Sequence, residues 1–150
     1  MQEELSTLVK AQYPLIYLVT SEEERAERAI ATIAQQEKPQ RSVYLWTVTH
    51  GIVEYGDRPR QSVQHNTVSP EAAIEWVVRQ KDPGLYIFKD LHPFIDSPPV
   101  TRYLRDAIAS FKGTHKTIVL MSPIQQIPTE LEKEVAVIDF PLPNMSELNE

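Results

Sequence analysis

The sequence predicts an α/β fold of three layers, in which helices cover both faces of a five-stranded, mainly parallel sheet. Two observations lead to this prediction. Short apolar runs alternate along the chain with longer segments whose apolar residues recur at helical spacing, a pattern typical of parallel strands joined by right-handed crossovers. The first run, residues 15–19, is apolar at every position, as expected of a central strand covered on both faces.

Length, charge and cysteine content limit the possible functions. The 150 residues are 41% apolar and 24% charged, which fits one globular domain. The net charge of −6 opposes a phosphate backbone, so we expect no nucleic-acid partner. The chain has no cysteine, which excludes disulfides, thiol catalysis and cysteine-ligated metals.

The amino-terminal sequence gives no sign of export or membrane insertion. Residues 1–5 are acidic and lack the apolar segment of a secretory signal. No apolar run approaches the ~20 residues needed to span a bilayer. We therefore expect a soluble protein that stays in the compartment where it is made.

The elements of the first half follow from local pattern. Residues 2–12 predict a short lead-in helix that Pro14 stops, and residues 15–19 predict the first strand. Ser21 with Glu24 is a capping box for a second helix, which ends at Lys38-Pro39. Its predicted buried stripe is Ala26, Ala29, Ile30 and Ile33, and its predicted exposed residues are Glu22, Glu23, Arg25, Glu27 and Arg28.

The remaining elements continue the alternation. Residues 43–48 predict the second strand, residues 49–57 a small β excursion or hairpin, and the polar residues 57–68 an exposed loop. Ser69-Pro70 is a helix start before the turn at residues 82–84. Later predicted elements are a strand at 85–90, a helix from Ser97 to Gly113, a strand at 117–121, a short acidic turn or helix at 128–134 and a strand at 135–138.

The junction after the first strand has the position of a phosphate site but the wrong charge. In phosphate-binding α/β domains this turn carries glycines and a lysine that face the ligand. Here the helix opens with Glu22, Glu23 and Glu24. Each carboxylate gains about 0.3–1 kcal/mol from the helix dipole, yet would repel a phosphate. The sequence Gly-x-x-x-x-Gly-Lys-Ser/Thr is absent from the chain.

Five segments spread over nearly the whole chain resemble the N-terminal portion of a cyanobacterial and plastid family of AAA-type ATPases, known as a conserved hypothetical chloroplast reading frame. The resemblance implies a degenerate ATPase-like domain over residues 1–140, with residues 141–150 beginning a linker to a true AAA module. It also implies the strand order 5-1-4-3-2 of ATPase cores. The segments are Tyr13–Tyr17, Ser21–Arg25, Lys89–Phe94, Thr117–Pro123 and Asp139–Pro143.

The same resemblance sets expectations for function. Asp90 stands where a Walker B acid would be, and Ser122 where a sensor residue would be. ATP and magnesium belong to the parent ATPase module, and this chain needs no cofactor. The expected role is non-catalytic: assembly with the AAA module or capture of another protein, with a homo-oligomer as a further possibility. The implied setting is the cyanobacterial cytoplasm or the plastid stroma, in photosynthesis-related physiology.

The alternative function is a magnesium-dependent hydrolase or nucleotide-binding enzyme. Glu22, Glu23 and Glu24 would hold a divalent cation together with Asp90 and Asp96, because carboxylates at neighbouring strand ends bind hard cations. Helix-dipole and capping effects also explain these glutamates, so we assign no catalytic, cofactor-binding or metal residue. The alternative site consists of Glu22, Glu23, Asp90, His92, Asp96 and Ser122.

Each other candidate also has a structural interpretation. Asp90 and His92 could form an acid–base pair, but His92-Pro93-Phe94 more simply anchors a rigid loop with Phe94 packed inward. Ser122 lacks the surroundings of a nucleophile and is expected to cap a turn.

The histidines and the basic residues are weaker candidates. His50, His65 and His115 lack the spacing of a zinc site. Lys38, Arg41, Arg58 and Arg60 could form a basic patch beside Tyr55 and Trp46, although a solvated loop is the simpler interpretation. Trp46 and Trp76 are expected to be core aromatics.

Overall fold

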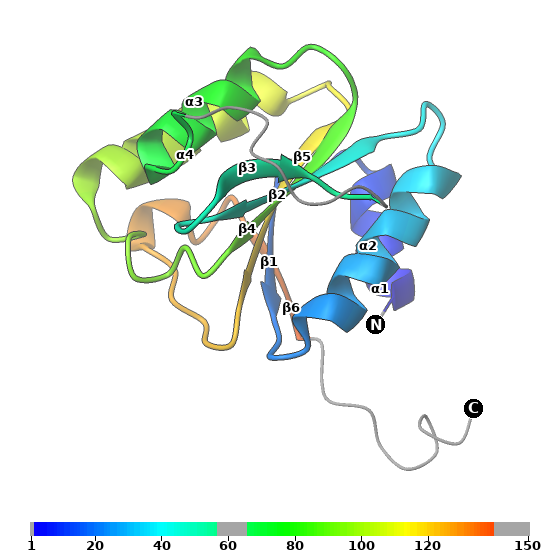
Figure 1. The fold of residues 1–150 in the computed structure, drawn as a ribbon, viewed down its shortest axis with the longest axis horizontal. Coiled ribbons are helices and arrows are strands. Elements are labelled where there is room, and N and C mark those ends of the chain that lie inside the picture. The colour runs from blue at the N-terminus through cyan, green and yellow to red at the C-terminus, as the bar shows by residue number, and fades with distance from the viewer. Residues whose placement is uncertain (1, 57–65, 140–150) are drawn as a thin grey trace.

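A mixed sheet forms the middle layer of the computed structural model, which describes residues 2–56 and 66–139 (Figure 1). In these residues the strand order is β3-β2-β4-β5-β1-β6. Neighbouring strands are parallel, except that β3 runs antiparallel to β2. The strands are β1 (Leu15–Val19), β2 (Ser42–Thr47), β3 (Gly51–Glu54), β4 (Gly84–Lys89), β5 (Lys116–Ser122) and β6 (Ala136–Asp139).

The predicted α/β class is confirmed, and the predicted strand count was too low by one. The five expected strands occur in the expected order, β6-β1-β5-β4-β2, with β1 inside the sheet. The described residues add β3, which the sequence indicated as a small β excursion. It pairs with β2 from Tyr44↔Glu54 to Thr47↔Gly51 and forms an edge strand of the sheet. Its residues Ile52 and Val53 are buried.

Helices cover both faces of this sheet (Figure 1). α1 (Gln2–Lys10) and α2 (Glu23–Gln36) pack on one face, and α3 (Pro70–Arg79) and α4 (Pro98–Phe111) on the other. A 3-10 turn, η1 (Thr129–Leu131), precedes β6. Each face has its own apolar core, and Trp46 and Trp76 lie in the one beneath α3 and α4, as predicted. None of the helices described has the length and apolar character needed to cross a membrane.

The start of α2 differs from the prediction. The helix begins at Glu23, its N-cap is Glu22, and no side chain caps it, so the capping box of Ser21 and Glu24 is not formed. The hydroxyl of Thr20 instead accepts a hydrogen bond from the Glu22 backbone N–H at 2.9 Å. The cap predicted at Ser69 is confirmed, because its hydroxyl accepts a 3.1 Å bond from the N–H of Ala72.

Thr67 closes the outer edge of β3. Its hydroxyl accepts a 2.9 Å hydrogen bond from the backbone N–H of Ile52, and its carbonyl accepts a 2.8 Å bond from Trp46 Nε1. The approach requires glycine at position 51, where φ is +70° and an added Cβ would lie 2.8 Å from Thr67 Oγ1. Residues 57–65 of the predicted loop lie outside the described residues.

We predict that Gly51→Ala destabilises the protein by about 1–3 kcal/mol, because the new methyl group meets both an unfavourable φ and a steric clash. Gly56→Ala is the matched control, since nothing lies within 4 Å of an added Cβ there. Urea unfolding of the two variants measures the difference. Equal stabilities would show that Thr67 does not close this edge.

Candidate functional site

A buried ion pair lies where β4 ends beneath α2. Lys89 is the last residue of β4 and only 7% exposed. It lies two residues beyond Ile87, in the alternation that faces α2. Its Nζ donates a 2.9 Å hydrogen bond to Glu27 Oε2 and lies 3.8 Å from Glu23 Oε1. Glu27, predicted to be exposed, is 2% exposed.

The pair ties α2 to β4, which lies two strands away from β1, the strand that leads into α2. α2 leads from β1 to β2, and β5 and β4 lie between those two strands. Removing a lysine and a glutamate from water is costly unless the two charges meet. The structure therefore tolerates Lys89 at this inward position only while α2 presents Glu27 to it.

The charges of this site are the reverse of those that bind phosphate. A phosphate-binding turn places a lysine after the first strand and an acid at the end of a later strand. Here the acids stand on α2 and the lysine at the strand end, and the two groups neutralise each other. Glu22 and Glu23 are half-buried and Glu24 is exposed. A phosphate group at this place would therefore meet carboxylates instead of hydrogen-bond donors.

The structure places the predicted acidic residues at the same edge of the sheet without gathering them into a metal site. Asp90 is exposed in the left-handed region, with φ of 57°, and its N–H donates to the carbonyl of Met121 at 2.9 Å. Asp96 accepts a 2.9 Å hydrogen bond from Gln126 Nε2. Within residues 2–56 and 66–139, no three or more histidines or carboxylates are grouped so that they could hold a metal ion.

His92 is half-buried, and within the described part of the chain its Nδ1 has no hydrogen-bond partner. The Asp90–His92 acid–base pair therefore does not form through this atom. Phe94 turns inward as expected, with its ring edge-on to Trp46 at a centroid distance of 6.4 Å. The segment after β4 is therefore anchored by aromatic packing.

Ser122 is a buried structural residue at the end of β5. Its Oγ lies 2.7 Å from the Tyr17 hydroxyl and donates to the carbonyl of Ile124 at 2.6 Å. Tyr17 Oη also donates to Ile124 O at 2.6 Å and accepts from the N–H of Gln126 at 3.1 Å. These bonds hold the turn that follows β5, in agreement with the predicted role of Ser122.

The basic patch, the weaker of the two interpretations, does not form around Arg41 and Trp46. Both residues are buried. Arg41 donates to Thr117 Oγ1 at 3.0 Å and to the carbonyl of Val9 at 2.9 Å, and pairs with Glu37 at 3.5 Å. Burial lowers its pKa from the ordinary value, opposed by the charge of Glu37. Arg58 and Arg60 lie outside the described residues.

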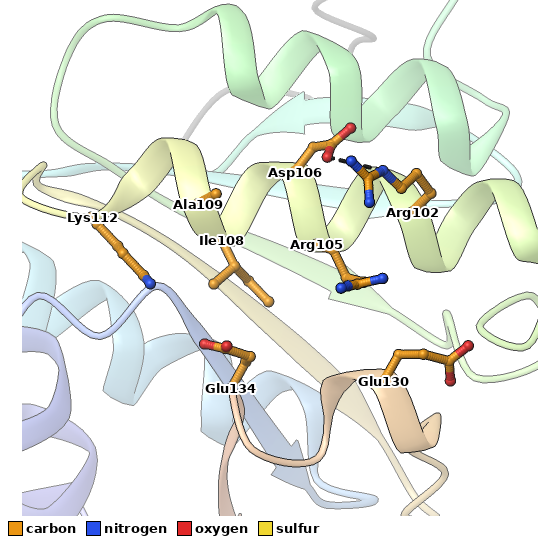
Figure 2. Close-up of a pocket in the computed structure, with 8 residues that line it drawn as sticks. All are labelled: Arg102, Arg105, Asp106, Ile108, Ala109, Lys112, Glu130 and Glu134. Atoms are coloured by element: carbon orange, nitrogen blue, oxygen red, sulfur yellow. Dashed lines mark ion pairs between the residues drawn. The ribbon is translucent and has the colours of Figure 1, made fainter.

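A groove of about 260 Å³ lies between α4 and the η1 segment (Figure 2). Arg102, Arg105 and Lys112 come from α4 or its end, and Glu130 and Glu134 lie on the opposite side. Arg102 pairs with Asp106 of its own helix at 3.2 Å, and both side chains are exposed. The groove therefore offers solvated charges of both signs.

A second hollow, of about 350 Å³, lies at the amino end of the sheet, between the ends of α3 and α4. Lys116 lines it and is itself buried. Its Nζ donates to the carbonyls of Val78 and Gln80 at 3.0 and 2.6 Å, so the lysine caps the end of α3. Burial lowers its pKa from 10.5 to about 8.

Sequence reasoning missed the Lys89–Glu27 pair, although a signal was present. Lys89 occupies an inward position of an otherwise apolar strand, which demands a buried acidic partner. Glu27 belongs with Ile30 and Ala34 to the buried side of α2. The helical pattern of α2, considered without its partner strand, places Glu27 on the charged face.

Comparison with known proteins identifies similar chains. Residues 1–140 match the family model described as SpoVK-like AAA ATPase, N-terminal domain. The chain is 34% identical over 148 residues to the "Uncharacterized AAA domain-containing protein ycf46" of Guillardia theta, covering 97% of this chain and 28% of that protein. The proteins of the same name from Trieres chinensis and Gracilaria tenuistipitata var. liui are 32% and 30% identical over 152 and 147 residues, covering 99% and 97% of this chain and 29% of each relative. The chain thus spans less than a third of the length of these curated relatives.

We predict that Lys89→Met and Glu27→Met each destabilise the protein by about 3–5 kcal/mol, because each leaves a buried charge unpaired. The double variant should lose less stability than the sum of the two single losses, since both of its buried positions are then apolar. Arg102→Ala and Asp106→Ala remove the exposed pair as a control and should show a coupling of only about 0–1 kcal/mol. Additive losses at Lys89 and Glu27 in urea unfolding would contradict the pairing.

The lowered pKa of Lys116 predicts a pH dependence of stability. Between pH 8 and 10.5 the folded protein releases this proton while the unfolded chain still binds it. The contribution of this group to the free energy of unfolding therefore rises with pH in that window. The stability of the wild type relative to Lys116→Met should increase from about pH 8 to about pH 10. A constant difference would show that Lys116 titrates normally, and a falling one that its pKa is raised; either would contradict the lowered pKa.

Proposed function

This chain belongs to the family of SpoVK-like AAA ATPase N-terminal domains, and we propose that within that family it is a non-catalytic accessory domain. Its task would be to assemble with the AAA ATPase module or to capture a partner protein. ATP and magnesium would be used by the ATPase module and not by this chain.

The observation that supports this proposal is the reversed charge where β1 and β4 end. An ATPase needs a cation and backbone donors facing the phosphates. Lys89, a buried cation at this place, already pairs with Glu27. The first turn of α2 adds Glu23 and Glu24, which repel an anion. A nucleotide would have to break a buried ion pair to gain a cation here.

Binding would instead use the outer surface of the sheet's carboxyl end. The segments that follow β1, β4 and β5 meet there, joined by hydrogen bonds from Thr20 N–H to Ser122 O and from Asp90 N–H to Met121 O, both at 2.9 Å. In Figure 1 the turns after β1 and β5 lie together below the sheet. The segment 49–68, of which residues 57–65 lie outside the described part, would extend this surface.

The cellular setting is part of the same proposal. We propose the cyanobacterial cytoplasm or the plastid stroma, in photosynthesis-related physiology, with a homo-oligomer as one possible form of assembly. The similarity to ycf46 proteins, one of them from Guillardia theta, supports this setting.

We predict that ATP, ADP and MgCl₂, singly or combined, leave the melting temperature of this chain unchanged. A ligand present at about one hundred times its dissociation constant would stabilise the folded state by about 2.7 kcal/mol, a shift of several degrees. A nucleotide-binding AAA module, melted under the same conditions, is the positive control. A clear shift with ATP and magnesium would contradict the accessory role and favour an enzyme that uses Glu22, Glu23, Asp90 and Asp96.

A further inference from the structure

We propose that the carboxyl-end rim of the sheet binds a basic amphipathic helix of a protein partner, a helix with apolar side chains flanked by lysine or arginine. The rim consists of residues 20–24, 48–51, 67–69, 90–97 and 123–126. The proposal rests on the accessory function above and specifies the chemistry of its partner.

The exposed large apolar side chains of the described residues concentrate on this rim. Val48, Val68 and Ile124 are 47%, 42% and 50% exposed, and Val137, 40% exposed on β6, lies elsewhere. Val48 follows β2 and Ile124 follows β5, and parallel strands end at the same edge of the sheet. Val68 lies at the same edge, next to Gly51, the first residue of β3. A Cβ added to Gly51 would lie 3.2 Å from the backbone nitrogen of Val68.

Two hydrogen bonds hold the backbone of Ile124, whose side chain is exposed. Its carbonyl accepts hydrogen bonds from both Tyr17 Oη and Ser122 Oγ at 2.6 Å. The side chain of Gln126 joins the same turn to Asp96 at 2.9 Å. Because these contacts already order the turn, a partner that covers Ile124 loses little conformational entropy in fixing it. A buried polar network therefore supports an apolar side chain that faces solvent.

The negative charge of the rim favours a positively charged partner. Asp90 and Asp96 follow β4, which lies between β2 and β5, so these carboxylates stand between Val48 and Ile124 along the rim. Glu24 lies in the first turn of α2, which follows β1. Among the rim residues defined above, these three are the charged side chains that are exposed, and all are acidic. Lys89, a cation next to the rim, is buried and pairs with Glu27, and Arg25, which follows Glu24, is half-buried.

Side chains rather than a strand edge form this surface. The rim is made of strand ends and turns, so a partner finds no row of free backbone groups to extend the sheet. A helix meets the requirement, because residues three and four apart present apolar and basic groups on one face. The groove of Figure 2 lacks this combination. It has charges of both signs, and Val48, Val68 and Ile124 do not line it.

The test uses a synthetic amphipathic peptide of leucine and lysine as the probe, with its binding followed by calorimetry. Two comparison peptides replace all lysines by glutamate or all leucines by glutamine. We expect the leucine–lysine peptide to bind this chain and the comparison peptides to bind at least about tenfold more weakly, because each lacks one half of the required chemistry.

Matched variants locate the binding surface. Ile124→Ser and Asp96→Asn should each weaken binding about fivefold or more. Asn retains a carbonyl acceptor for Gln126, so Asp96→Asn removes the charge alone. Val137→Ser and Glu130→Gln make the same kinds of change away from the rim and should alter binding less than about twofold.

Equal weakening by the rim and control variants, or equal binding of all three peptides, would overturn the proposal. A third result would also overturn it: millimolar MgCl₂ displaces the peptide from the wild type, and the Asp96→Asn variant no longer shows this displacement. The carboxylates would then serve to bind a cation. These outcomes are separate from the nucleotide experiment. Loss of rim-specific binding with an unchanged melting response to ATP removes this proposal and leaves the accessory role intact.

Discussion

The ion pair buried between β4 and α2 is the constraint on which the rest of the structure depends. Lys89 can lie inside only if α2 turns Glu27 toward it, and this fixes the rotation of the helix over the sheet. The same rotation sets the direction in which the first turn of α2 carries Glu23 and Glu24. One electrostatic requirement therefore links the packing of a whole layer to the loss of a phosphate-binding surface.

The consequences reach the edge of the sheet where ligands of α/β folds usually bind. The Lys89–Glu27 pair occupies the inner part of this edge, so the segments after β1, β4 and β5 are available as an outer surface. Tyr17 and Ser122 use a buried hydroxyl pair to shape the turn that carries Ile124. Phe94 anchors the segment that carries Asp96 through its contact with Trp46. Core side chains thus position the exposed groups of the rim.

Local pattern was enough for the class and for most elements, because apolar runs and helix starts are short-range signals. Residues 15–19 indicated an interior strand, and Ser69 indicated a cap, from neighbours within a few positions. The failures involve partners far away in sequence. Local pattern places Glu27 and Arg41 at the surface, because a charged residue is normally solvated, and only the folded chain brings Lys89 and Thr117 beside them. The Ser21–Glu24 box does not form because α2 begins at Glu23 with Glu22 as its N-cap, so Ser21 lies one residue before the capping position.

The side-chain ammonium signal of Lys89 in ¹H–¹⁵N NMR tests the central claim most directly. An ammonium group buried against Glu27 should exchange slowly with water and give a resolved correlation that disappears in Glu27→Gln. The correlation should remain unchanged when ATP and magnesium are added. A rapidly exchanging Lys89 ammonium group, or a signal that shifts as nucleotide binds, would contradict the claim.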